Sequence, residues 1–182
     1  MGGTQARGRV DPDAARVGWS PRLANWEDAA VPPDRMGDYL RDFEKLLDNA
    51  GYDGIMFGHW GQGCIHCRID WDLRSRDGVQ RFRQFMEQAA DLVVSYGGSL
   101  SGEHGDGHGR AELWPKMFSP ELMRAFADFK RVWDPDNKMN PHKLIDPYPL
   151  DTHLREGTEY RPIHLKTVFR YRGDDGDPEH PE

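Results

Sequence analysis

Residues 54–73 read GIMFGHWGQGCIHCRIDWDL, and this stretch decides the fold that the sequence predicts. A short apolar run leads into a Gly-Gln-Gly turn, and a segment of alternating side chains follows. From residue 64 onward the odd positions are Ile, Cys, Ile, Trp and Leu, whereas the even positions are Cys, His, Arg, Asp and Asp. Because successive side chains of a strand point to opposite faces, this alternation predicts a half-buried strand with one polar face. The two segments are therefore expected to lie side by side like a hairpin.

Amphipathic helices are predicted on both sides of this pair in the sequence. Apolar residues recur at helical spacing over residues 33–50, over residues 77–96 and over residues 119–133. Prolines mark the start of the first predicted helix and Gly51 marks its end, and Asp77 is expected to open the second helix. Helices and antiparallel strands thus alternate, which predicts an α+β fold in which helices cover one face of an antiparallel sheet.

The composition limits the class of protein and its partners. With 182 residues, 37% hydrophobic and 30% charged, the chain is sized for one ordinary domain with tails. A net charge of −7 argues against nucleic acid as a partner. The apolar stretches are shorter than the roughly 20 residues that span a bilayer, and the two cysteines form no disulfide framework, so the cytoplasm is the expected compartment.

The chain is expected to divide into three parts. Residues 1–23 mix Gly, Pro, Arg and Asp without a period and predict a loose leader. Residues 24–149 form the predicted domain. Residues 150–182 predict an extended tail with one strand-like piece, at 152–172, and an acidic end. No glycine-rich phosphate loop joins a strand to a helix, so a self-contained nucleotide domain is not expected.

Two histidines and a glutamate form a candidate metal site. His59 and His66 flank the Gly-Gln-Gly turn, and Glu103 lies in the glycine-rich stretch SLSGEHGDGHGR of residues 99–110. Three protein ligands and an open position are what a catalytic divalent metal requires. The alternative is that the pair arises by chance among eight histidines, as ordinary turn residues.

The neighbouring residues suggest separate roles. Cys64 and Cys67 are three apart on a strand and so face opposite sides, which places Cys67 in the core and argues against a joint role of the two thiols. His104, beside Glu103, has an ordinary pKa near neutrality and is placed for general-base work. The alternative for His104 and for His108 is a solvated loop histidine.

Three segments in order resemble a known family. They are FGHWGQGCIH at 57–66, SGEHGDG at 101–107 and FKRVWDPDNKMNPHKLID at 129–146. Together they resemble the C-terminal cap of FAD-linked oxidases of the vanillyl-alcohol oxidase type. The nearest branch is that of the 2-hydroxy-acid dehydrogenases of the D-lactate, glycolate and D-2-hydroxyglutarate type, in which an iron–sulfur region follows the cap. The resemblance covers roughly residues 24–171 and implies a partial, ferredoxin-like cap domain.

The resemblance implies roles for individual residues. His59, His66 and Glu103 are expected to bind a divalent metal, zinc or manganese, that holds the substrate oxygens. His104 is expected to remove the hydroxyl proton while the C2 hydride passes to flavin, and to lie at the cofactor. Asn140 matches a family segment that lies near the flavin.

Some positions depart from the family pattern. Gln62 and Cys64 stand where many members have Asp and Asn, and His142 stands where the usual residue is Gly. Gln62, Cys64 and Arg68 are expected to line the substrate. A histidine at 142 is expected to stiffen a turn that suits glycine.

The resemblance also implies partners. The expected partners are a small anionic 2-hydroxy acid, an FAD-binding domain or subunit, an iron–sulfur electron acceptor and a second copy of the chain. On this view the chain is a fragment or a split subunit, because the main FAD-binding domain precedes the cap in the family, and an electron-transfer partner would bring it to the membrane surface. Two alternatives stay open: a metal-binding or assembly domain without turnover, and a metal-dependent hydrolase with Glu103 or Asp106 as base.

Overall fold

The structure, a computed structural model, describes residues 22–161. Nearly all of the predicted leader and the acidic end therefore lie outside the described residues. Within them, strands and helices alternate along the chain as the sequence predicts. The strands are β1 (Ala29–Ala30), β2 (Gly54–His59) and β3 (Cys64–Ile69). The helices are α1 (Met36–Ala50), α2 (Arg76–Ser95), α3 (Gly107–Arg110) and α4 (Pro120–Trp133), with short 3-10 turns η2 (Pro33–Arg35), η3 (Trp60–Gln62) and η4 (Ala111–Lys116).

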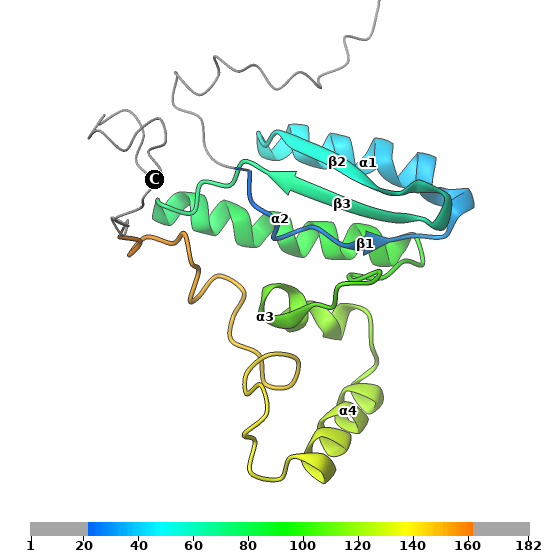
Figure 1. The fold of residues 1–182 in the computed structure, drawn as a ribbon. Helices are drawn as coiled ribbons and strands as arrows, with labels where there is room; N and C mark the ends of the chain where they lie inside the picture. The colour runs from blue at the N-terminus through cyan, green and yellow to red at the C-terminus, as the bar shows by residue number, and fades with distance from the viewer. Residues whose placement is uncertain (1–21, 162–182) are drawn as a thin grey trace, which may run out of the picture.

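The three strands form one antiparallel sheet in the order β1-β3-β2. β2 and β3 are the predicted hairpin, with Phe57 opposite His66 and His59 opposite Cys64. The two-residue strand β1 pairs with the start of β3 on its other side. The predicted α+β fold with an antiparallel sheet is confirmed (Figure 1).

The hydrophobic core lies between the sheet and the helices α1 and α2. The odd positions of residues 65–73 are buried in it, as the alternation predicts, and Cys67 is 1% exposed. Each helix contributes a stripe of large side chains, among them Phe43 of α1 and Phe85 of α2. The rings of these two residues meet edge to face with their centroids 6.0 Å apart. This face of the sheet is closed by packing, which leaves the even positions of β3 on the opposite face.

The connection between β2 and β3 depends on one glycine. Gly63 has φ +82°, and its carbonyl accepts a hydrogen bond of 3.0 Å from the amide of Val31. A Cβ on Gly63 would lie 1.9 Å from the carbonyl oxygen of Val31, so no other residue fits without moving the backbone. The neighbouring Gly61 has nothing within 4 Å of such a Cβ.

Gly63→Ala is expected to lower the free energy of unfolding by about 3 kcal/mol, because the left-handed backbone and the collision with Val31 add. Gly61→Ala is the matched control in the same turn and is expected to change it by less than about 1 kcal/mol. Urea unfolding of the two variants measures the difference. Equal stability of both variants would contradict the close backbone approach.

Two expectations are corrected, one about the start of α2 and one about the burial of β3. Asp77 does not open α2, because the N-cap is Ser75, whose hydroxyl oxygen accepts the amide N–H of Gly78 at 3.0 Å. Ser75 in turn donates to the carboxylate of Asp72 at 2.5 Å, which fixes the cap, and Asp77 lies in the first turn of the helix. β3 is also not simply half-buried, since Cys64 and His66 on its polar face are 7% and 6% exposed. The segments of residues 27–28 and 99–104 cover them.

The described part of the predicted tail packs against α2. Residues 152–161 form turns and bends rather than a strand, and the remainder of the strand-like piece lies outside the described residues. Leu150 is buried in the core. Arg83 of α2 pairs with Glu112 at 2.9 Å and with Asp151 at 3.0 Å, and these charged contacts hold the segment. None of the helices within residues 22–161 is long and apolar enough to cross a membrane.

α4 and the segment after it form an arm that points away from the sheet (Figure 1). The predicted helix is confirmed, with Ser119 as its N-cap and Pro120 at the first position. Asp134 ends it, and its buried carboxylate accepts the amides of Lys138 and Met139 at 2.8 and 2.9 Å. His142 has φ +59°, so the turn there does adopt the left-handed backbone that suits glycine.

Candidate metal and acid–base centre

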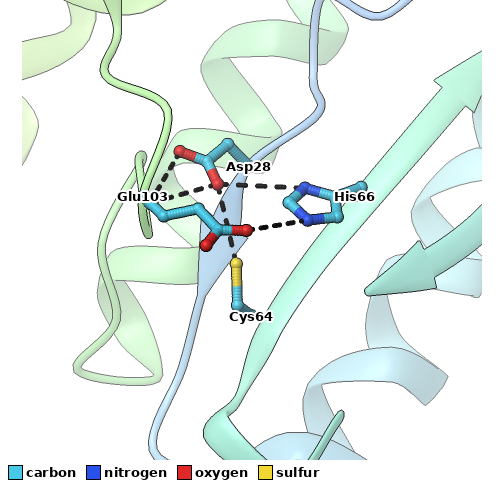
Figure 2. A group of neighbouring side chains, drawn as sticks. All are labelled: Asp28, Cys64, His66 and Glu103. Carbon is cyan, nitrogen blue, oxygen red and sulfur yellow. Dashed lines mark hydrogen bonds and ion pairs between the residues drawn. The ribbon is translucent and has the colours of Figure 1, made fainter. Parts of the chain in front are cut away.

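The even face of β3, the loop of residues 99–106 and the segment before β1 meet in one cluster (Figure 2). Its charged members come from four places in the sequence. They are Glu27, Asp28, His59, His66, Glu103 and His104. The sheet thus brings together the four residues predicted for metal binding and catalysis.

One carboxylate oxygen lies at the centre of the cluster. Glu103 Oε1 is 3.1 Å from His59 Nε2, 3.2 Å from His66 Nε2 and 3.6 Å from His104 Nε2. The three imidazoles therefore direct the same ring nitrogen toward one point. His59 and His104 have side chains 58% and 48% exposed, so the cluster is open on one side.

The contacts of His66 fix its tautomer, and they indicate that a proton or a cation lies between its Nε2 and Glu103 Oε1. His66 Nδ1 lies 2.6 Å from the backbone carbonyl of Glu27, and since a carbonyl only accepts, Nδ1 carries the proton. In the neutral ring Nε2 then presents a lone pair to Glu103 Oε1, 3.2 Å away. Two lone pairs at that distance repel unless a proton or a cation lies between them. A histidine that donates its second ring N–H to a carbonyl is also the usual arrangement of a metal ligand.

The distances fit a coordination sphere. Ligand atoms about 2.0–2.2 Å from a zinc ion, at angles between octahedral and tetrahedral, lie about 2.9–3.5 Å apart. The contacts of 3.1 and 3.2 Å that Glu103 makes with His59 and His66 are in this range. These two contacts of Glu103 therefore fit a divalent metal, whereas the ring nitrogens of His59 and His66 are too far apart to be grouped as ligands of one ion without a turn of the exposed His59 ring.

His59 is the most exposed of the three proposed metal ligands. Within residues 22–161, donor atoms converge to within 4.8 Å of one another in two groups. The members are Asp28, Cys64, His66 and Glu103 in one group, and Glu27, His66 and His104 in the other. His59 belongs to neither: its Nε2 lies 3.1 Å from Glu103 Oε1, and its ring lies edge to face with that of His66, with centroids 5.8 Å apart. Its exposed position at the end of β2 leaves the ring room to turn toward His66.

A buried carboxylate that the sequence did not single out anchors the loop. Asp28 is 0% exposed, and it accepts the Ser101 hydroxyl at 2.5 Å and the amides of Glu103 and His104 at 3.0 and 2.7 Å. Burial by itself would raise the pKa of Asp28, but these hydrogen bonds outweigh it and the pKa is lowered. The carboxylate therefore stays charged and fixes the backbone from which Glu103 and His104 project. The signal in the sequence was a pair of acids, Glu27 and Asp28, inside an otherwise apolar segment.

Glu27 orients the candidate base. Its Oε2 lies 2.9 Å from His104 Nδ1, and this hydrogen bond raises the pKa of His104 above its ordinary value. Because the carboxylate takes the N–H of Nδ1, the free lone pair of neutral His104 is on Nε2. The buried Arg110 lies 3.4 Å from the other oxygen of Glu27 and holds the pair in place. The imidazole of His104 also stacks on His66, with ring centroids 4.7 Å apart.

Asp106 is already paired. Its carboxylate accepts Arg110 Nε at 3.1 Å and Trp114 Nε1 at 2.6 Å, and the residue is buried. With both oxygens occupied it is poorly placed to act as a base, so the hydrolase alternative retains only Glu103. His108 lies outside the cluster, packed against Tyr148 and His153.

Of the three residues predicted to line the substrate, Cys64 is buried, whereas Gln62 and Arg68 are exposed. The Cys64 thiol is buried beneath Gly102, where a Cβ would lie 2.7 Å from its sulfur, and it donates to Asp28 at 3.6 Å. Burial and the nearby carboxylates raise the pKa of Cys64 to about 11, so the thiol is protonated. Gln62 in η3 and Arg68 on β3 are exposed. Contact of Cys64 with a substrate would require the loop to move, so its role stays a prediction.

Asn140 does not join the cluster. It is exposed, has φ +48°, and belongs to the segment that follows α4. Its predicted position near the flavin is separate from the metal centre and stays a prediction.

Comparison with known proteins identifies the family to which the chain is similar. A family model described as FAD linked oxidases, C-terminal domain, matches residues 4–144. The chain is 40% identical over 152 residues to the D-2-hydroxyglutarate dehydrogenase of Haemophilus influenzae, covering 79% of the chain and 15% of that protein. It is 35% identical to the D-2-hydroxyglutarate dehydrogenase of Escherichia coli, covering 81% and 15%, and 35% identical to the D-lactate dehydrogenase of Archaeoglobus fulgidus, covering 65% and 26%.

The chain thus spans about 15% of the length of the D-2-hydroxyglutarate dehydrogenases that it matches. The match includes every residue of the cluster on the sheet and the arm through residue 144. The chain belongs to the family of the C-terminal domain of FAD-linked oxidases.

Proposed function

We propose that this chain is the substrate-binding and catalytic cap of a flavin-dependent dehydrogenase that oxidises a D-2-hydroxy acid. The observation that carries the proposal is the convergence of three imidazole Nε2 atoms on Glu103 Oε1, at 3.1, 3.2 and 3.6 Å. The similarity to proteins named D-2-hydroxyglutarate and D-lactate dehydrogenase supports it.

His59, His66 and Glu103 would hold the metal. Two imidazoles and a carboxylate suit zinc or manganese, and the open side of the cluster leaves room for a hydroxy acid. When bound, a divalent cation supplies Lewis acidity and FAD supplies the hydride acceptor. His66 is held in the required tautomer by the Glu27 carbonyl, and Glu103 by the loop that Asp28 anchors.

His104 would take the substrate's hydroxyl proton at Nε2. Nδ1 is occupied by Glu27, which also stabilises the imidazolium that forms. Arg110 keeps the Glu27 carboxylate from turning away. These contacts orient the base before the substrate arrives, which is the arrangement that general-base catalysis favours.

The remaining predicted partners belong to the same proposal. FAD would be held mainly by an FAD-binding domain or subunit, with Asn140 near the flavin. An iron–sulfur electron acceptor, a second copy of the chain and a cytoplasmic location stay predictions.

Flavin reduction tests the proposal. The chain is produced together with an FAD-binding domain, and the loss of oxidised-flavin absorbance is followed without oxygen after D-2-hydroxyglutarate or D-lactate is added. His104→Gln is expected to slow this reduction by about 10²- to 10⁴-fold while the metal stays bound. His108→Gln, in α3 directly after this loop and outside the cluster, is the matched control and is expected to keep the wild-type rate.

Failure of every D-2-hydroxy acid to reduce the bound flavin would contradict the proposal. The assembly-domain alternative would then account better for a metal-binding chain without turnover. Equal rates for His104→Gln and wild type would retain the activity but remove His104 as the base.

A further inference from the structure

We propose that His108 operates a pH-dependent latch in this chain. While the His108 ring is neutral, it holds residues 142–149, here called the return segment, against α3, and in mildly acidic solution the charged ring releases them. The return segment leads from the arm back to the core (Figure 1). None of the residues of the latch belongs to the cluster on β3, so the latch is independent of the metal centre and of the reaction proposed above.

Aromatic rings connect α3 to the return segment. The centroid of the His108 ring lies 5.5 Å from that of Tyr148 and 6.2 Å from that of His153. The Tyr148 centroid in turn lies 4.5 Å from that of His142 and 4.5 Å from that of His153. Three histidines thus gather around one tyrosine, and His108 is the one that α3 contributes.

One nitrogen of the His108 ring is buried without a partner. His108 Nε2 is shielded from solvent and has no hydrogen-bond partner among residues 22–161. A neutral imidazole carries a proton on one nitrogen and a lone pair on the other, whereas a charged imidazole carries a proton on both. Protonation would therefore leave a charged N–H group buried without an acceptor, which is less favourable than a lone pair in the same place.

The surroundings of His108 oppose its protonation in the docked state. Burial lowers the pKa of His108 below its ordinary value, and the charges of Lys143 and His153 lower it further. A hydrogen bond to the backbone carbonyl of Pro149 acts in the opposite sense and does not outweigh them. Because Lys143 lies in the return segment, docking of this segment and protonation of His108 oppose each other.

The carboxylates on the elements around His108 are already paired with arginines. They are Asp106 of α3, with Arg110 at 3.1 Å, and Glu112 of η4 and Asp151, with Arg83 at 2.9 and 3.0 Å. Asp146 of the return segment is exposed, and its backbone carbonyl lies 3.1 Å from His142 Nδ1. A positive charge on His108 is therefore poorly compensated by acids that arginines already neutralise.

The backbone of the return segment is strained, which favours its release. His142 and Asp146 have φ +59° and +48°, a left-handed conformation that residues other than glycine adopt at a cost. Such a conformation persists only where packing holds it. Leu150, directly after the segment, is buried, and its amide donates to Glu112 at 2.7 Å. Release is therefore expected to stop at Leu150 and to leave the core folded.

The latch is expected to be closed at neutral pH and to open in acid. The docked ring of His108 has a pKa below that of a free histidine, which is about 6.5, so docking favours the neutral ring. Its contribution to docking is fully present above about pH 6.5 and is lost as pH falls through the lower pKa of the docked ring.

Proteolysis of the whole chain at two pH values tests the latch. Thermolysin, which cleaves before large apolar residues, is expected to cut before Leu144 and Ile145 once the return segment is released. Cleavage is located by mass spectrometry, and a free peptide with the sequence of residues 140–150 corrects for the protease's own pH dependence. The corrected rate is expected to rise about 5-fold from about pH 7.5 to about pH 5.5, because cleavage follows the population of the open form.

Three variants separate the charge of His108 from other effects of acid. His108→Gln cannot gain a proton, so the corrected rate is expected to rise by less than about 1.5-fold. Lys143→Met removes a charge that opposes protonation in the docked state and is expected to reduce the rise to about 2-fold. Lys45→Met, which removes an exposed lysine of α1, is the matched control and is expected to respond as the wild type.

Nuclear magnetic resonance gives a second readout that does not depend on cleavage. The Hε1 resonance of His108, assigned by its loss in His108→Gln, is expected to titrate with a midpoint below that of histidine in the free state. Lys143→Met is expected to raise this midpoint, since it removes a neighbouring positive charge.

The latch is overturned by equal rises in cleavage for wild type and His108→Gln, or by no rise in the wild type. Should His108→Gln be cleaved rapidly at both pH values because its side chain does not pack, the titration and Lys143→Met decide. A low midpoint for His108, together with a smaller rise in Lys143→Met, upholds the latch. A midpoint at or above that of free histidine overturns it.

Discussion

Glu103→Gln is expected to abolish metal binding and to slow flavin reduction by about 10³-fold or more. Glu103 Oε1 is the atom on which His59, His66 and His104 converge, and the carboxylate supplies the negative charge among the proposed ligands. An amide at this position keeps the shape but removes the charge that binds the cation. It can also turn an N–H toward the imidazoles.

The measurement combines elemental analysis of the purified protein with the flavin-reduction assay. Because the Glu103 side chain is 43% exposed, the variant is expected to unfold at the same urea concentration as the wild type, which separates loss of the site from loss of the fold. Glu44→Gln, an exposed glutamate of α1, is the control and is expected to change neither quantity. Full metal content and full turnover in Glu103→Gln would place the metal elsewhere.

Asp28→Asn is expected to lower the free energy of unfolding by about 3–5 kcal/mol and to weaken metal binding as well. The buried carboxylate receives donors from Ser101, Glu103 and His104, and asparagine replaces one acceptor oxygen by an NH₂ group that faces those donors. The loop that carries Glu103 and His104 then loses its anchor. Asp91→Asn, an exposed residue that pairs with Lys116, is the control and is expected to cost less than about 1 kcal/mol.

The pH dependence of stability gives an independent check. The folded-state pKa of Asp28 is lowered, so its contribution to stability is present above the unfolded pKa of about 3.9 and is lost as pH falls through the folded pKa. Urea unfolding of wild type and Asp28→Asn is therefore expected to differ most near pH 7 and to converge below about pH 4. A constant difference at all pH values would show that the charge of Asp28 plays no part.

Much of the fold follows from local patterns. The alternation over residues 64–73 predicts which side chains of β3 enter the core, because a strand has only two faces. It also separates Cys64 from Cys67, and the structure confirms the core position of Cys67. The N-cap of α2 was predicted two residues late, at Asp77 instead of Ser75, because Asp72 and Ser75 form the cap together and such a pair is less visible than a single acid at a helix start.

The candidate centre could be predicted only in part from the sequence. Spacing alone could not choose between a metal site and turn histidines at His59 and His66, and the family motifs made the choice. The contributions of Glu27, Asp28 and Arg110 depend on contacts across 75 to 85 residues of sequence, which no local pattern reports. Two acids within an apolar segment indicate burial, but not which loop they hold.

The most direct test of the central claim is metal content. The purified chain is loaded with zinc or manganese, freed of loosely bound ions, and measured by elemental mass spectrometry beside His59→Ala. His59 is 58% exposed and at a strand end, so the fold is expected to survive its replacement. The account predicts about one equivalent of metal in the wild type and little in His59→Ala. No metal in the wild type, or equal metal in both proteins, would contradict it.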